Sequence, residues 1–126
     1  MNDENTTDRR QVGLRRMAEV YGWEVTDGPG DFFSMTIEHL FAEVWTREGL
    51  SDRDRRLVLI GLMVGTGLMD VAELQLDAAL RIGELDEDEL RELVILLTHY
   101  AGWPKGAQLN SIVETLISRR SRATKD

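Results

Sequence analysis

Hydrophobic residues recur every three to four positions along most of the chain, which is the spacing typical of amphipathic helices. Ile37, Leu40, Phe41 and Val44 form the clearest stripe, and no segment shows the sustained alternation that would mark a strand. Glycines and prolines interrupt the pattern and mark the connections. The pattern therefore predicts an all-α fold with six helices. We expect them over residues 8–20, 32–48, 55–68, 69–82, 90–100 and 104–119.

Polar and charged residues dominate both ends of the chain, so residues 1–7 and 121–126 are expected to be disordered. Residues 8–120 contain enough apolar positions for a single domain with its own core. Several predicted helices are apolar nearly all round, and a chain of 126 residues can hardly cover them all by itself. We therefore expect a homo-oligomer that buries the surplus apolar surface.

The composition excludes several kinds of function. There is no cysteine, which removes disulfides, thiolate metal sites, Cys nucleophiles and dithiol redox chemistry. A formal net charge of −8 argues against a nucleic-acid partner. The longest apolar run, Leu57 to Leu68, is about half of what a membrane-spanning helix needs, and the polar start is unlike a signal peptide. We therefore expect a cytoplasmic protein with no membrane partner.

Three carboxylates in the fourth predicted helix are the first candidates for chemistry. Asp70, Glu73 and Asp77 have the spacing i, i+3, i+7, which places them within about 60° of one another on a helix. Two such groups can act as an acid/base pair when one is kept protonated by the charge of its neighbour. The alternative is a solvated or salt-bridged face, with Arg81 one turn after Asp77. A metal site is the weaker alternative, because no histidine is well placed.

A second polar stripe lies beside the apolar stripe of the second predicted helix. His39 and Glu43 are four residues apart, a spacing at which a carboxylate can tune an imidazole for proton transfer. Arg47 follows one turn later. The alternative is an exposed polar face with a modest ion pair.

Arginines and aromatic residues supply candidate substrate-binding groups. Arg53, Arg55 and Arg56 begin the third predicted helix, and guanidinium geometry suits a carboxylate ligand. Pairing with nearby acids is the alternative. Tyr100 could donate a hydrogen bond to a substrate oxygen and Trp103 could close a pocket, although both could equally be packing residues at a helix end. Trp45 has the same two interpretations.

The order of these signals along the chain resembles a known family. Glu43-Val-Trp-Thr-Arg47 precedes Gly49-Leu50-Ser51 and Arg53-x-Arg55, and an apolar helix follows. Next come Glu73-Leu-x-Leu-Asp77, Ala79-Leu80, Gly83, an acidic helix start and Tyr100-x-Gly102-x-Pro104. Over residues 32–118 this set resembles the carboxymuconolactone decarboxylase family, whose members have the AhpD-like fold.

The resemblance implies a six-helix orthogonal bundle that assembles into trimers or hexamers. It also implies a lyase without cofactor, which converts γ-carboxymuconolactone to the enol-lactone of β-ketoadipate in aromatic catabolism and releases CO₂. The redox branch of the family carries Cys-x-x-Cys-x-x-x-His on the helix that matches residues 70–77. The two cysteine positions fall on Asp70 and Glu73 and the histidine position on Asp77. Thiol peroxidase-reductase activity is therefore excluded, because the sequence has no thiol.

The sequence thus predicts a cofactor-free, metal-free decarboxylase acting on a small carboxylated lactone or a related carbonyl compound. Glu73 or Asp77 would donate the proton, and Tyr100 or His39 would face the developing oxyanion. The expected substrate-binding residues are Glu43, Trp45, Arg47, Arg55 and Trp103. Two alternatives remain open: a non-catalytic oligomeric binding or scaffold protein that kept the fold, and a family enzyme with a different small carbonyl substrate.

Overall fold

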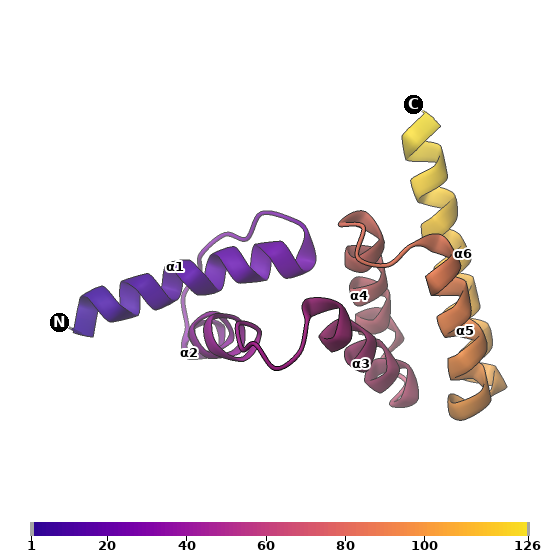
Figure 1. Ribbon diagram of the computed structural model, residues 1–126, viewed down its shortest axis with the longest axis horizontal. Coiled ribbons are helices and arrows are strands. Elements are labelled where there is room, and N and C mark those ends of the chain that lie inside the picture. Colours follow the sequence, from indigo (N-terminus) through magenta and orange to yellow (C-terminus); the bar gives the residue numbers. More distant parts are fainter. Residues whose placement is uncertain (1, 126) are drawn as a thin grey trace. The chain divides into compact units, whose positions relative to one another are not determined.

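The computed structural model describes residues 2–125, and the side chains of residues 8–123. All the regular elements over this part of the chain are helices (Figure 1), which confirms the all-α prediction. The six predicted helices are all present, and the second is divided between an α-helix and a π-helix. The elements are α1 (Asn2–Tyr21), α2 (Asp31–Met35), η1 (Thr36–Val44), α3 (Asp52–Gly65), α4 (Met69–Arg81), α5 (Glu87–Ala101) and α6 (Trp103–Lys125).

The chain divides into two compact units, of which unit 1 ends at Asp52 and unit 2 begins at Arg53. The single domain over residues 8–120 stays a prediction. The disorder of residues 1–7 and 121–126 also stays a prediction. Residues 1 and 126 lie outside the described part of the chain. No helix among the described residues is long and apolar enough to cross a membrane.

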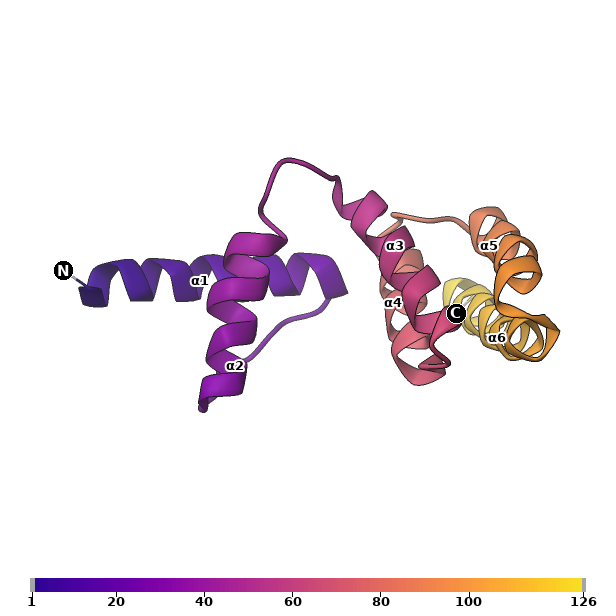
Figure 2. The ribbon, with the colours of Figure 1, turned by 90° about the horizontal axis from the view of Figure 1, so that it is seen from below.

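In unit 1, α1 crosses η1 at very short range (Figure 2). A Cβ atom at Gly13 would lie only 2.0 Å from the carbonyl oxygen of Ile37, so the crossing requires glycine at this position. Ile37 and Phe41 are buried against α1 together with Val20. This contact forms the small core of unit 1.

A hydrogen-bonded arginine fastens the loop of unit 1 to its helices. The guanidinium of Arg10 donates to Asp27 at 2.6 Å, to Ser34 at 2.7 Å and to the carbonyl oxygen of Gly28 at 2.6 Å. It also lies 5.5 Å from the centre of the Phe33 ring, a cation–π contact. These contacts hold the connection between α1 and α2 in place.

The π-helix η1 differs from the predicted α-helical stripe. The amide of Trp45 donates to the carbonyl oxygen of Leu40 at 2.9 Å, the i→i+5 bond that defines this wider turn. Ile37 and Phe41 are buried as the stripe predicts, but Leu40 and Val44 are exposed. The stripe was wrong for these two residues because the wider turn changes which positions share a face.

In unit 2, helices α3 to α6 pack around one apolar core. Helix α5 begins with a complete capping box, in which the Asp86 side chain accepts from the Glu89 amide and the Glu89 side chain accepts from the Asp86 amide. The acidic run at this position therefore starts a helix, as predicted. The buried core residues are Ile60, Val64, Ala72, Leu76, Ala79, Leu80, Leu85, Leu90, Val94, Leu109, Val113, Leu116 and Ile117.

Candidate functional site

The three carboxylates of α4 line one depression on unit 2, together with residues of α6. Ala72, Leu76 and Ala79 are buried on one face of α4. The three acids lie outside that buried face. Glu73 and Asp77 are partly buried. We call this depression, of about 240 Å³, the acidic groove; it is lined by Asp70, Glu73, Leu74, Asp77, Leu116 and Arg119.

A second depression of about 220 Å³ adjoins the acidic groove and shares Asp77, Leu116 and Arg119 with it. Arg81 and Arg120 also line this second depression. The Arg81 guanidinium donates to the Asp77 carboxylate at 3.2 Å, so Asp77 forms the salt bridge that the sequence offered as the alternative to an acid/base role. The surface around Asp77 therefore offers both carboxylates, which can exchange protons, and guanidinium groups, which can bind anions.

Arg119 is the charged residue of the acidic groove that the sequence did not single out. The last predicted helix, over residues 104–119, ends at this residue. Helix α6 continues to Lys125, so Arg119 lies within the helix, where it lines the groove with residues of α4. The only signal in the sequence was the Arg119-Arg120 pair at a helical spacing from Leu116.

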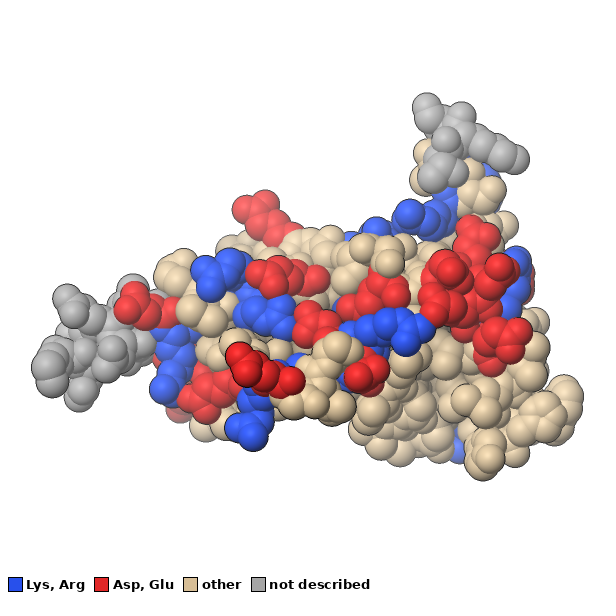
Figure 3. Space-filling view, in the orientation of Figure 1, with Lys and Arg blue, Asp and Glu red and all other residues tan. Residues whose placement is uncertain are grey.

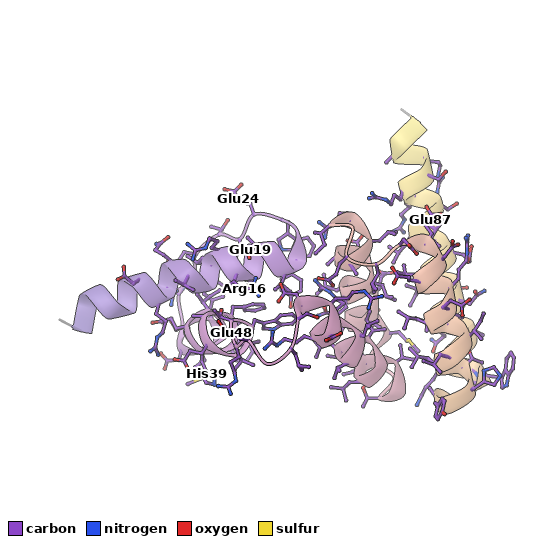
Figure 4. All side chains as sticks on the ribbon, in the orientation of Figure 1. Arg16, Glu19, Glu24, His39, Glu48 and Glu87 are labelled. Atoms are coloured by element: carbon purple, nitrogen blue, oxygen red, sulfur yellow. The ribbon has the colours of Figure 1, made fainter. Side chains whose placement is uncertain are left out.

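The predicted residues His39 and Glu43 of unit 1 pair with each other. The Nδ1 atom of His39 lies 3.0 Å from a carboxylate oxygen of Glu43, as their spacing predicts. The other carboxylate oxygen of Glu43 lies 2.5 Å from a guanidinium nitrogen of Arg9, with which it forms an ion pair. His39 lies at the outer edge of unit 1 (Figure 4), with 68% of its side chain exposed.

Two further predicted residues follow η1 and have contrasting surroundings. Trp45 is only 5% exposed and its ring lies 6.0 Å from that of Phe41, in a stacked arrangement. Its carbonyl oxygen accepts a hydrogen bond from Arg16. Arg47 is exposed. Trp45 therefore contributes to the packing of unit 1, and its predicted part in substrate binding stays a prediction.

The three arginines at the start of α3 have different surroundings. Arg53 is exposed and forms an ion pair with Glu89. Arg55 is partly buried. Arg56 is fully buried, and donates to Glu84 at 2.8 Å and to Gln75 at 2.7 Å. Both contacts tie α3 to α4 and to the connection that follows α4, so Arg56 supports the helix that carries the carboxylates.

The end of α5 and the start of α6 line a different surface depression, of about 370 Å³. Trp103 lines it, whereas Tyr100 is 86% exposed and is not part of the lining. It has no lining residue in common with the acidic groove. We call it the apolar pocket; it is lined by Val94, Ile95, Thr98, His99, Trp103, Gly106, Ala107 and Asn110.

The charge on the surface of unit 2 changes along α5. Acidic side chains gather over its first turn, where Glu87, Asp88 and Glu89 lie (Figure 3). The surface toward the end of α5 and the start of α6 is mostly uncharged in the same view. Among the described residues, no group of three His, Asp or Glu side chains is arranged to hold a metal ion.

Comparisons with known proteins identify a family and a relative of this chain. The model of the carboxymuconolactone decarboxylase family matches residues 30–115. The chain is also 33% identical over 112 residues to a 4-carboxymuconolactone decarboxylase of Acinetobacter baylyi, and the match covers 82% of this chain and 81% of that relative. No solved structure matches the chain.

Proposed function

We propose that this chain, which belongs to the carboxymuconolactone decarboxylase family, is a cofactor-free lyase acting on a small carboxylated lactone in aromatic catabolism. The observation that carries the proposal is the acidic groove, which Glu73, Asp77 and Arg119 line together. The similarity to the 4-carboxymuconolactone decarboxylase supports the class of substrate.

In this reaction the bond between the ring carbon and its carboxylate breaks, and CO₂ leaves. The electron pair moves through a ring double bond to the lactone carbonyl oxygen, and a proton is then delivered to carbon. Glu73 or Asp77 supplies that proton as the general acid. Arg119 binds a substrate carboxylate in the groove, since a guanidinium matches a carboxylate in charge and geometry.

The other predicted residues keep their proposed roles with less support. Arg55 remains a candidate anchor and Tyr100 a candidate donor to the developing oxyanion, because both are on unit 2. His39, Glu43, Trp45 and Arg47 belong to unit 1, and their roles in substrate binding or catalysis stay predictions. Trp103 lines the apolar pocket instead of the acidic groove.

We also propose that the protein works as a cytoplasmic homo-oligomer, a trimer or a hexamer. Unit 2 exposes large apolar side chains on α3 and α5, which a surface in contact with water rarely gathers. Contact between copies would remove them from water. The residues are Val58, Leu62, Ile95 and Leu96.

The test is CO₂ release from γ-carboxymuconolactone by the purified protein after exhaustive dialysis against a chelator. We expect turnover, together with a rise in melting temperature in the presence of lactone and dicarboxylate ligands. The proposal is contradicted if a well-formed oligomer neither turns over the lactone nor is stabilised by any of these ligands. That result would favour a non-catalytic scaffold. Stabilisation without turnover would favour a different carbonyl substrate.

A further inference from the structure

We propose that Arg56 and Gln75 are positioning residues for the reaction, because their buried contact fixes the rotation of α4 about its own axis. That rotation decides where Glu73 and Asp77 lie in the acidic groove. Neither Arg56 nor Gln75 lines the groove itself. The inference rests on the proposed lyase function, and it adds the residues that hold the general acid in place.

Gln75 and the acids of the groove lie on opposite sides of α4. Successive residues of an α-helix are about 100° apart, so Gln75 lies about 160° from Glu73 and about 160° from Asp77 around the helix axis. Gln75 is only 4% exposed, whereas Glu73 and Asp77 are partly buried. A contact that holds Gln75 at one angle therefore also fixes the angle of both acids on the other side of the helix.

Arg56 of α3 holds Gln75 through a directional contact. Its guanidinium donates to the side-chain oxygen of Gln75 at 2.7 Å. The Nε atom of the same guanidinium donates to the carboxylate of Glu84 at 2.8 Å, and only 11% of the Glu84 side chain is exposed. Because Glu84 follows α4, one rigid planar group fastens the helix at its middle and again just beyond its end.

The apolar packing of α4 resists such a rotation less than this contact does. The buried part of the helix includes Ala72, Ala78 and Ala79, whose side chains are single methyl groups. The attraction between apolar surfaces is non-directional, so it changes little when a smooth face turns slightly against its neighbours. A hydrogen bond weakens steeply away from its preferred angle. The hydrogen bond between Arg56 and Gln75 therefore sets the angle of α4.

A small rotation of α4 is enough to disturb the reaction. A helix with its side chains has a radius of about 5–6 Å, so a turn of about 20° moves a carboxylate by about 2 Å. A misplacement of about 1 Å can lower turnover about 100-fold. Arg119, the proposed partner of the substrate carboxylate, is on α6 and does not turn with α4. Loss of the Arg56–Gln75 contact should therefore lower kcat and leave KM nearly unchanged.

The test compares Q75M and V64A with the wild type, as full-length proteins acting on γ-carboxymuconolactone. Q75M keeps nearly the same side-chain volume but has no amide oxygen to accept from Arg56. Its kcat per folded molecule should fall about 100-fold, and its KM should stay within about threefold of the wild type. V64A is the control, because it removes buried apolar volume from α3 and lowers stability while it keeps the contact. Its kcat per folded molecule should match that of the wild type.

Residual dipolar couplings of the backbone amides give a second readout, which needs no turnover. These couplings vary periodically along a helix, and the phase of the variation reports the rotation of the helix about its axis. Q75M should shift the phase of α4 relative to that of α5, and V64A should not.

The proposal is overturned if Q75M keeps the phase of α4 or the kcat of the wild type. It is also overturned if V64A loses as much kcat as Q75M, because general destabilisation would then explain both. If the wild type does not turn over the lactone, the proposed function fails. The phase of α4 in Q75M then shows separately whether Arg56 and Gln75 fix the rotation of the helix.

Discussion

The acidic groove and the apolar pocket share helix α6 but use opposite kinds of chemistry. The groove is formed beside the last turns of the helix, where Arg119 faces the carboxylates of α4. The pocket is formed beside its first turns, where Gly106 lies against α5. Charged side chains dominate the groove, whereas mostly uncharged side chains line the pocket. One helix thus lines both a charged depression and a mostly apolar one, because different turns of α6 pack against α4 and α5.

The largest effect is expected from the support beneath the groove. Arg56 is fully buried and bonded to Glu84 and Gln75. R56M leaves the carboxylate of Glu84 without this partner in a mostly buried position, and should lower the free energy of unfolding by about 3–5 kcal/mol. Urea denaturation followed by circular dichroism measures the change.

The matched control is R53M. Arg53 is exposed, lies one turn before Arg56 on α3 and forms an ion pair with Glu89. It should cost no more than about 1 kcal/mol, the usual range for a surface ion pair. Equal losses for the two variants would contradict the view that the buried arginine, and not charge in general, holds α4.

The next effect concerns the packing of α5 against α6 beside the apolar pocket. G106A forces a Cβ atom to within 2.1 Å of the Thr98 hydroxyl, so the helices must separate, at a cost of about 1–3 kcal/mol. G61A is the control, because its Cβ would meet only Leu97 at 3.9 Å, an ordinary contact. This control should stabilise the protein by about 0.5–1 kcal/mol, since alanine favours the helix. The melting temperatures of both variants measure these changes. If G106A melts at the same temperature as the wild type, α5 and α6 are not tightly packed at this position.

A smaller effect is expected at the start of α5, the end remote from the pocket. D86A removes the cap that accepts from the Glu89 amide at 2.8 Å and should cost about 1 kcal/mol. D88A keeps the cap and loses only a favourable charge in the first turn, worth about 0.3–1 kcal/mol. Hydrogen exchange should show fraying of the first turn in D86A but unchanged protection around Thr98. Loss of protection at both ends would show that α5 responds as a whole.

The smallest effect is a dependence on acid. The Arg91 guanidinium, bonded to Glu114 between α5 and α6, lowers the pKa of that carboxyl below its usual 4.5. Because the folded pKa lies below the unfolded one, the ion pair stabilises the protein above about pH 4.5, and this contribution is lost as the pH falls through the folded value. E114Q should therefore lose less stability than the wild type between pH 6 and pH 3. E92Q changes an exposed glutamate and should show the same dependence of stability on pH as the wild type. If all three proteins show the same dependence, the ion pair of Arg91 and Glu114 does not cause it.

The helices were predictable because their signals are local. The 3.6-residue period and the Asp86 capping signal act within one or two turns, and both agree with the structure. The π-helix was missed because nothing in the spacing of Ile37 and Phe41 distinguishes a wider turn. The close crossing at Gly13 was missed because it depends on a helix distant in sequence.

The candidate site follows the same division. The common face of Glu73 and Asp77 was predicted, since residues four apart on a helix are neighbours. Arg119 lines the same groove through the packing of α6, and the Arg119-Arg120 pair in the sequence does not show which helix it meets. Arg56 looked like its neighbours Arg53 and Arg55 in the sequence, and burial alone separates it from them.

The most direct test of the acidic groove is the turnover of γ-carboxymuconolactone by E73Q and D77N. E92Q, at an exposed position of α5, is the matched control. Loss of a general acid typically lowers turnover by about 10²–10⁴-fold, so at least one of the two groove variants should fall into this range while E92Q matches the wild type. All three proteins should have the same helical content by circular dichroism. Full turnover in both E73Q and D77N would show that the carboxylates of α4 do not transfer the proton.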